Sequence, residues 1–271
     1  MNPPVSDAER VDQALVSRGL ARSRAVAREF VLAGRVHADG DLITKPSVKV
    51  DESVELGVSG EIDPWVGRAA HKLLGALDTF ALDPSGRRAI DVGASTGGFT
   101  QVLLSRGAVQ VEAVDVGHDQ LATVVRDDER VNDHSGVSVR GLDPATIGGP
   151  ADLVVTDLSF ISLTLVLADL ARLMTHDGEL IALVKPQFEV GRERLGHGGV
   201  VRSAGERARA VREVLMATGR AGLHVCGLVR SAVAGTGGNH EYLLWARRST
   251  EGKMDEAAQA AFVTTIEQET A

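Results

Sequence analysis

The chain has 271 residues, of which 44% are hydrophobic, and a formal net charge of −8 at pH 7. A chain of this length can bury a real core, and we expect one large domain and one small one. The negative charge excludes a protein that is basic throughout, so any surface for nucleic acid must be local. Aromatic residues make up only 3% of the chain, which argues against an aromatic platform that stacks single strands.

Further features of the composition indicate a cytoplasmic protein. The single cysteine, Cys226, excludes an internal disulfide and fits a reducing compartment. The chain opens without a signal-peptide pattern, and no apolar run approaches the roughly 20 residues that span a bilayer. No cluster of His, Cys, Asp and Glu has the spacing of metal ligands. We therefore expect neither a metal nor a membrane partner, and the sequence does not determine the oligomeric state.

Residues 1–9 predict a polar tail, and residues 10–58 predict a small α+β domain. Apolar residues at helical spacing predict a helix that begins at Val11 and ends near Gly19. Ser23 is a suitable N-cap for a second helix, which Gly34 ends. Two short apolar stretches around the turn at residues 38–41 predict a hairpin.

The second helix and its surroundings form a basic face in this acidic chain, which by charge alone could be an ordinary solvated helix surface. The order of residues in 10–57 is more specific, because Asp12, Gly19-Leu20, Ser23-Arg24, Asp39-Gly40 and Lys45-Pro46-Ser47 resemble the S4 RNA-binding domain. This resemblance implies that the domain binds structured RNA through its phosphates. The candidate RNA-binding residues are Arg18, Arg22, Arg24, Arg28, Arg35 and Lys45.

Residues 59–66 mix Gly, Pro and polar groups and predict a linker, and residues 67–250 predict the large domain. The domain opens with an amphipathic helix at residues 67–77. Lys72 lies there beside three leucines, and such a lysine usually extends to solvent. Alone it would not indicate a site.

The large domain is organised around residues 89–100, AIDVGASTGGFT. A short apolar run, a small-residue turn and a helix that begins at about Gly97 predict a buried parallel strand, a close-approach turn and a helix N-terminus. A P-loop would need Gly-Lys-Ser/Thr here, and a dinucleotide fingerprint would need glycine where Ser95 stands. Neither pattern is present.

Two acids instead favour S-adenosylmethionine as the cofactor. Asp91, before the turn, suits a ligand with a cationic amino group. Asp115 ends a second strand at residues 111–115 and can accept the two ribose hydroxyls of an adenosine. Taken alone, either the turn after Asp91 or the strand that ends at Asp115 could belong to an ordinary α/β unit without this cofactor. The candidate cofactor-binding residues are Asp91, Gly93, Ser95, Thr96, Gly97, Gly98, Phe99, Asp115 and Val116.

The rest of the chain alternates between strands and helices. We expect a helix at 119–126, a weak strand at 136–139, strands at 152–157 and 179–184, a mobile glycine-rich loop at 191–203 and a helix at 204–218. Strands at 224–229 and 242–246 close the sheet, and an acidic tail at 251–271 has a helical pattern. The fold class is therefore α/β, a doubly wound, mostly parallel, seven-stranded Rossmann-like sheet whose ligand lies at the carboxyl ends of its strands.

The type of methyl acceptor is narrowed by residues that are missing. Methylation of pyrimidine C5 needs a cysteine nucleophile, but Cys226 lies on a late apolar strand without a motif around it. Methylation of an exocyclic base amine commonly uses Asp, Asn or Ser followed by Pro-Pro and an aromatic residue after the fourth strand. At this place the chain reads Asp157-Leu158-Ser159-Phe160. Charged residues at the cleft remain: Lys72, Asp157, Lys185 and Glu241. A ribose hydroxyl needs a strong base, and a lysine can serve when desolvation or a neighbouring cation lowers its pKa. A buried ion-pair network without catalytic role is the alternative.

The whole chain resembles the TlyA family, an S4 domain fused to an FtsJ-type 2′-O-ribose methyltransferase. The matching stretches are HKLLGAL (71–77), DVGASTGGFTQVLL (91–104), AVDVGHDQL (113–121), DLVVTDLSFISL (152–163), LVKPQFEVG (183–191) and GNHEYLLW (238–245). The resemblance implies that Lys72, Asp157, Lys185 and Glu241 are the catalytic tetrad, with Lys185 as the base. It also implies S-adenosylmethionine as cofactor and cytidines of ribosomal RNA, presented as RNA or as a ribosomal subunit, as substrate.

Three departures from the family pattern lie outside the tetrad. They are Gly67-Arg68-Ala69-Ala70 before the first lysine, Ser138 near the expected adenine site, and His197 in the glycine-rich loop. Two other functions stay open: a non-catalytic RNA-binding factor for ribosome assembly, and a haemolysin, since members of this family often carry that label. No strongly basic amphipathic stretch supports membrane lysis.

Overall fold

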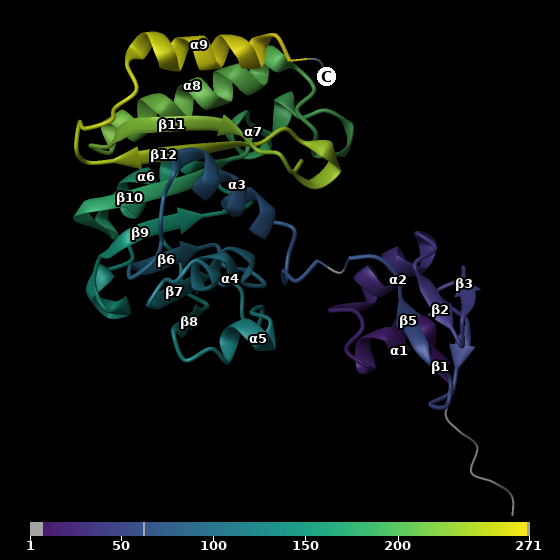
Figure 1. The fold of residues 1–271 in the computed structure, drawn as a ribbon. Coiled ribbons are helices and arrows are strands. Elements are labelled where there is room, and N and C mark those ends of the chain that lie inside the picture. Colours follow the sequence, from purple (N-terminus) through teal and green to yellow (C-terminus); the bar gives the residue numbers. More distant parts are fainter. Residues whose placement is uncertain (1–7, 62, 270–271) are drawn as a thin grey trace, which may run out of the picture. The chain divides into compact units, whose positions relative to one another are not determined.

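The structure is a computed structural model that describes residues 8–61 and 63–269. The chain divides into two compact units, Met1–Pro64 and Trp65–Ala271 (Figure 1). The division lies within the expected linker.

The N-terminal unit has the expected order of helices and strands. Ser23 caps the second helix, because its hydroxyl accepts from the Val26 N–H at 3.3 Å. Gly19 and Gly34 follow the two helices with positive φ, as expected of helix-ending glycines. One difference is that the first strand already includes Glu9, within the expected tail. The elements are β1 (Glu9–Arg10), α1 (Val11–Ser17), α2 (Arg24–Leu32), β2 (Val36–Ala38), β3 (Asp41–Ile43), β4 (Lys49–Val50) and β5 (Leu56–Val58).

The small unit has its own core. Strand β2 pairs with β3 and β5, and β1 pairs with β4, all antiparallel. Leu15 of α1, Phe30 and Val31 of α2 and Val36 of β2 are buried in one hydrophobic cluster. The amphipathic face predicted for both helices is therefore the face that packs.

The C-terminal unit is an α/β domain. Its helices are α3 (Ala70–Phe80), α4 (Gly98–Ser105), α5 (Thr123–Arg126), α6 (Leu167–Arg172), α7 (Pro186–Glu189), α8 (Ala204–Arg220) and α9 (Glu256–Glu267). Its strands are β6 (Arg88–Val92), β7 (Gln110–Asp115), β8 (Val131–Ser135), β9 (Ala151–Thr156), β10 (Met174–Val184), β11 (His224–Arg230) and β12 (Tyr242–Arg247).

These seven strands form one sheet in the order β11-β12-β10-β9-β6-β7-β8. Strand β12 runs antiparallel to both of its neighbours, and the other pairs are parallel. The chain starts in the middle at β6, goes outward to β8 and returns to β9 on the other side. This reversal places a ligand cleft at the carboxyl ends of β6 and β9. The predicted fold class is confirmed.

Alternate residues of the central strands enter two hydrophobic cores. On β10, Leu180 and Ala182 face the core beneath α6, α8 and α9, whereas Ile181 and Leu183 face the core beneath α3 and α4. Because both faces are covered, the strands read as continuous apolar runs.

Three expectations for the middle of the domain were wrong. The third strand is β8 at Val131–Ser135 rather than 136–139, and the helix expected at 119–126 is only Thr123–Arg126. Helix α6 was not predicted. Apolar periodicity did not predict β8 because it is a polar strand at the edge of the sheet. Its Asn132 and His134 form hydrogen bonds with the buried carboxylate of Glu112 and do not enter an apolar core.

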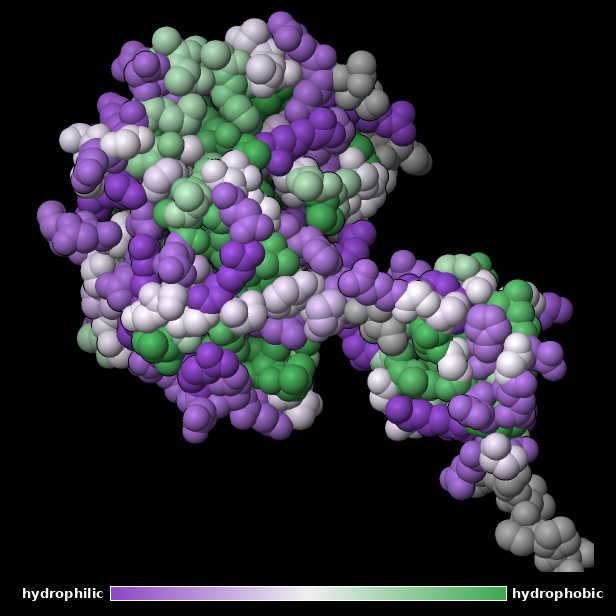
Figure 2. All heavy atoms as spheres, viewed as in Figure 1, coloured by the Kyte–Doolittle hydropathy of each residue, from purple (hydrophilic) through white to green (hydrophobic). Residues whose placement is uncertain are grey.

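The residues from 251 onward belong to the large unit rather than to a separate tail. Val263 and Ile266 of α9 are buried in the same core as α8. On the face drawn in Figure 2, hydrophilic and hydrophobic residues are interspersed over both units. Over the described ranges, no helix is both long and apolar enough to cross a membrane.

Candidate active site

The turn after β6 is shaped for close approach of a ligand. Gly93 and Gly97 have φ values of +86° and +90°, which residues with a Cβ rarely adopt. A Cβ on Gly93 would lie 3.0 Å from the carbonyl oxygen of Asp157 and 3.3 Å from Leu158. A Cβ on Gly97 would lie 2.8 Å from Val125. The turn therefore fits only with glycine at these two positions, and α4 begins directly after it at Gly98.

Asp91 lies beneath this turn rather than on its surface. It is fully buried, accepts from the Thr100 hydroxyl at 2.7 Å, and lines neither of the two cavities described below. Its other oxygen, Oδ1, has no hydrogen-bond partner among the described residues. Burial, assisted by the charge of Asp157 and only partly offset by the Thr100 hydrogen bond, raises the pKa of Asp91 to about 7.

Asp115 lies at the end of β7 in a cavity of about 490 Å³. Its carboxylate accepts from the N–H of Ser95 at 2.9 Å and from the N–H of Gly117 at 2.7 Å. A carboxylate has about four lone-pair positions, so it can accept two further bonds. Val116, Val139 and Leu158 line the same cavity and give it apolar walls.

The other cofactor candidates lie in four different environments. Gly93, Ser95 and Val116 line the cavity of Asp115, while Thr96 lines a second cavity. Gly98 packs against the start of α3, where a Cβ would lie 3.3 Å from the Ala70 nitrogen. The side chain of Phe99 is buried in the core beneath α3 and α4. Phe99 supports the turn from below, and its side chain lines neither cavity.

The second cavity has a volume of about 840 Å³ and brings together the four charged residues predicted as the tetrad. Asp157 directly follows β9, Lys185 directly follows β10, and Lys72 is on α3. Glu241 precedes β12, whose antiparallel direction puts that end beside the carboxyl end of β10, with Tyr242 opposite Val184. Sequence reasoning therefore predicted four residues that are as far as 169 positions apart but share one cavity.

The tetrad is two separate ion pairs. Lys72 Nζ lies 2.5 Å from Glu241 Oε2, and Lys185 Nζ lies 2.5 Å from Asp157 Oδ1. Both lysines are about nine-tenths buried, and Glu241 is more buried still. Glu241 pairs with Lys72 and not with Lys185, and its second oxygen accepts from Gln187 Nε2 at 2.9 Å.

Three residues around the pairs were not predicted. Gln187 fixes Glu241, and its own Oε1 is buried without a partner within the described ranges. The hydroxyl of Ser159 accepts from Lys185 Nζ at 2.9 Å. Gly235 is required because a Cβ there would lie 2.1 Å from Glu241 Oε1. Gln187 and Ser159 each lie two residues after a tetrad residue, Lys185 and Asp157, and this proximity was the only sign of their role in the sequence.

The candidate RNA-binding residues of the small unit divide by their contacts. Arg18 donates to the carbonyls of Asp51 and Val54, and Arg35 donates to those of Ser59 and Glu61. These two arginines fasten loops of their own unit.

The remaining candidates are more exposed to solvent. Arg24 pairs with the buried Asp12 at 3.4 Å, and Arg22 lies 4.0 Å from Asp63. Arg28 and Lys45 are exposed, and neither forms an ion pair or side-chain hydrogen bond within the described residues. Arg28 and Lys45 are therefore the most available for phosphate contacts.

Comparison with known families accounts for nearly the whole chain. Residues 9–56 match the S4 domain, and residues 65–248 match the FtsJ-like methyltransferase. The two matches correspond to the two structural units.

Individual relatives agree with these matches. The chain is 49% identical over 243 residues to the 16S/23S rRNA (cytidine-2′-O)-methyltransferase TlyA of Mycobacterium tuberculosis, covering 89% of this chain and 91% of the relative. It is 39% identical to the putative rRNA methyltransferase YqxC of Bacillus subtilis, covering 92% and 90%. A solved structure of a putative hemolysin from Streptococcus thermophilus is 36% identical, with a TM-score of 0.74 and 98% of each chain covered.

Proposed function

Because this chain belongs to the TlyA family, in which an S4 domain precedes an FtsJ-like methyltransferase domain, we propose that it methylates the ribose 2′-hydroxyl of cytidines in ribosomal RNA. The methyl donor is S-adenosylmethionine. One observation carries the proposal: the cavity with the two ion pairs adjoins the cavity with Asp115, since Asp157, Ser159 and Phe160 line both. A methyl donor in one cavity can therefore meet an acceptor hydroxyl in the other.

The smaller cavity fits the adenosine part of the cofactor. Asp115 would accept from the ribose hydroxyls, and the apolar walls formed by Val116, Val139 and Leu158 would cover the adenine. The glycine turn gives the backbone approach. Asp91 lies beneath the turn and has one buried oxygen without a partner among the described residues. It would attract the cationic amino group of the ligand. Bound there, S-adenosylmethionine supplies an electrophilic methyl group on a positively charged sulfur.

The two ion pairs have different roles in this proposal. Lys72 and Glu241 form a fixed pair, because Glu241 is also held by Gln187. Lys185 contacts Asp157 and Ser159 on the wall shared by the two cavities, and we assign it as the base that accepts the hydroxyl proton.

The S4 domain supplies the RNA contacts in this proposal. Arg22, Arg24, Arg28 and Lys45 would bind phosphates of a ribosomal subunit, whereas Arg18 and Arg35 would keep the RNA-binding loops in shape. An enzyme with this substrate works in the cytoplasm. A non-catalytic assembly factor is the main alternative, and the intact ion pairs and glycine turn argue against it.

A binding and transfer experiment tests the proposal. Purified protein is titrated with S-adenosylmethionine and then incubated with ribosomal subunits and cofactor labelled in the methyl group. We expect binding and label in ribosomal RNA, and Asp157→Asn should bind cofactor but transfer little. Cofactor binding without transfer to RNA of either subunit would contradict the proposal and favour the assembly factor.

A further inference from the structure

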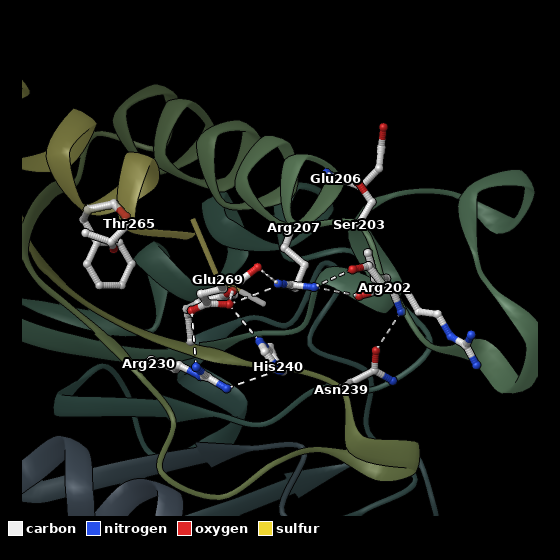
Figure 3. A network of polar contacts seen from close by, with 12 residues as sticks. Arg202, Ser203, Glu206, Arg207, Arg230, Asn239, His240, Thr265 and Glu269 are labelled. Atoms are coloured by element: carbon white, nitrogen blue, oxygen red, sulfur yellow. Dashed lines mark hydrogen bonds and ion pairs between the residues drawn. The ribbon is translucent and has the colours of Figure 1, made fainter. Parts of the chain in front are cut away.

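Glu269 lies just after α9 and belongs to a cluster of polar residues that includes both sequence neighbours of Glu241. One carboxylate oxygen, Oε2, lies 2.7 Å from His240 Nδ1 and accepts from the Tyr242 hydroxyl at 2.9 Å. The other, Oε1, lies 3.7 Å from Arg230. Figure 3 shows Arg230 and His240 pointing toward Glu269. One carboxylate near the end of the described chain thus connects α9 to β11 and to the segment that enters β12.

His240 and Tyr242 are the two immediate neighbours of Glu241. Side chains alternate between the faces of a strand, and Tyr242 faces the core beneath α8 and α9 while Glu241 reaches Lys72 on α3, on the other face. Glu269 therefore holds the backbone on both sides of Glu241. The direction of the Glu241 carboxylate depends on that backbone.

Arg207 extends the same cluster to the loop that lines the larger cavity. It is only 1% exposed, its Nε lies 3.4 Å from Glu269 Oε2, and its Nη1 donates to the carbonyls of Val201 and Arg202. Asn239 adds a second connection, because its Oδ1 accepts from the Val201 N–H at 3.0 Å (Figure 3). Asn239 and Gly199 both line the cavity.

The cluster is not needed simply to attach α9. Val263 and Ile266 already bury the apolar side of that helix against the core. Although burial alone raises the pKa of Glu269, hydrogen bonds from His240 and Tyr242 and the charge of Arg230 outweigh it and hold the pKa below its ordinary value. The site therefore favours a charged carboxylate at this position.

We propose that Glu269 is a positioning residue of the active site. Through His240, Tyr242 and Arg207 it fixes Glu241, which lines the larger cavity, and the loop at residues 199–203, of which Gly199 lines the same cavity. This inference rests on the proposed methyl transfer. Glu269 touches neither cavity, so it acts on the rate through the placement of other groups.

The test compares Glu269→Gln and Glu269→Asp with Glu267→Gln. Glu267 is the last residue of α9 and pairs with Arg212 on the surface at 2.9 Å, and it lines neither cavity. Single-turnover transfer to ribosomal subunits, cofactor affinity and amide hydrogen exchange are measured for each full-length variant. Glu269→Asp keeps the charge and shifts only its position, which covers the case that Glu269→Gln folds poorly.

Loss of placement should slow transfer by about tenfold to a hundredfold in Glu269→Gln, less in Glu269→Asp, with cofactor affinity unchanged. Exchange should accelerate at residues 199–203 and 231–241 but not in β9 and β10. The control should match wild type. Unchanged transfer in Glu269→Gln, or parallel loss of cofactor binding and transfer in both Glu269 variants, would overturn the inference. If wild type itself transfers no methyl group, the proposed function fails, and hydrogen exchange alone decides whether Glu269 fixes these segments.

Discussion

At the scale of single residues, the active site depends on which charge pairs with which. Lys72 and Lys185 each lie 2.5 Å from one carboxylate, so ion pairing does not distinguish them. Their other contacts do. Lys185 contacts Asp157 and Ser159, which line both cavities, whereas Lys72 pairs with Glu241, which also accepts from Gln187.

Arginine substitutions separate the two roles. Lys185→Arg keeps the positive charge but cannot provide a neutral amine, since guanidinium stays protonated. Methyl transfer should collapse while cofactor and RNA binding persist, and Lys72→Arg should retain part of the activity. Transfer rates with saturating cofactor measure this. An active Lys185→Arg with an inactive Lys72→Arg would reverse the assignment, and activity in both would refute a lysine base.

The pKa of Asp91 makes stability depend on pH. Its folded-state pKa of about 7 lies above the ordinary aspartate value of 3.8, so the native state binds more protons between these two values. The stabilisation from protonated Asp91 is complete below pH 3.8 and is lost as pH rises to about 7. The free energy of unfolding of wild type minus that of Asp91→Asn should therefore fall between pH 5 and pH 7. Urea denaturation without cofactor measures it; a constant difference would contradict the assigned burial effect.

At the scale of elements, apolar periodicity predicted the buried strands but not the polar edge strand. The strands β6, β9 and β10 were predicted because both of their faces are covered, which demands continuous apolar runs. Strand β8 was placed five residues late, because its buried partner is the charged Glu112. The pairing of each lysine with its own carboxylate was also beyond the sequence, since it depends on side-chain packing between distant segments.

The glycine turn supports a prediction at this scale. Gly97→Ala should destabilise the domain by about 1–3 kcal/mol, because alanine is strained at positive φ and its Cβ would meet Val125 at 2.8 Å. Gly75→Ala, inside α3 with no atom within 4 Å of its Cβ, should instead stabilise by about 0.5–1 kcal/mol. Chemical denaturation of both variants measures the contrast. Equal effects would mean that the turn tolerates a side chain.

At the scale of the whole molecule, the acidic charge is compatible with RNA binding because a local group of arginines surrounds α2. Arg22, Arg24, Arg28 and Arg35 lie on or beside this helix, with Glu29 the one acid among them. The S4 match and the exposed Arg28 and Lys45 support our proposal that the phosphate contacts lie in the small unit. Recognition of this unit from sequence depended on the order of residues, since charge alone also fits a solvated helix.

Charge reversal tests this location of RNA binding. Arg28→Glu with Lys45→Glu should weaken binding to ribosomal subunits and reduce its salt dependence, because fewer counterions are released. Arg220→Glu with Lys253→Glu changes the net charge equally at exposed positions of the large unit. Binding at several salt concentrations measures both pairs. An equal loss in both would mean that net charge, not the S4 surface, governs binding.

The position of the methyl group tests the central claim most directly. Alkali cleaves RNA through attack by the 2′-hydroxyl, so a 2′-O-methylated nucleotide leaves an uncleaved bond. Ribosomal subunits treated with the protein and S-adenosylmethionine are hydrolysed in alkali and the protected positions are mapped. We predict protection after cytidine with wild type and none with Lys185→Arg, whereas a methyl group on a base, with every bond cleaved, would contradict ribose methylation by this tetrad.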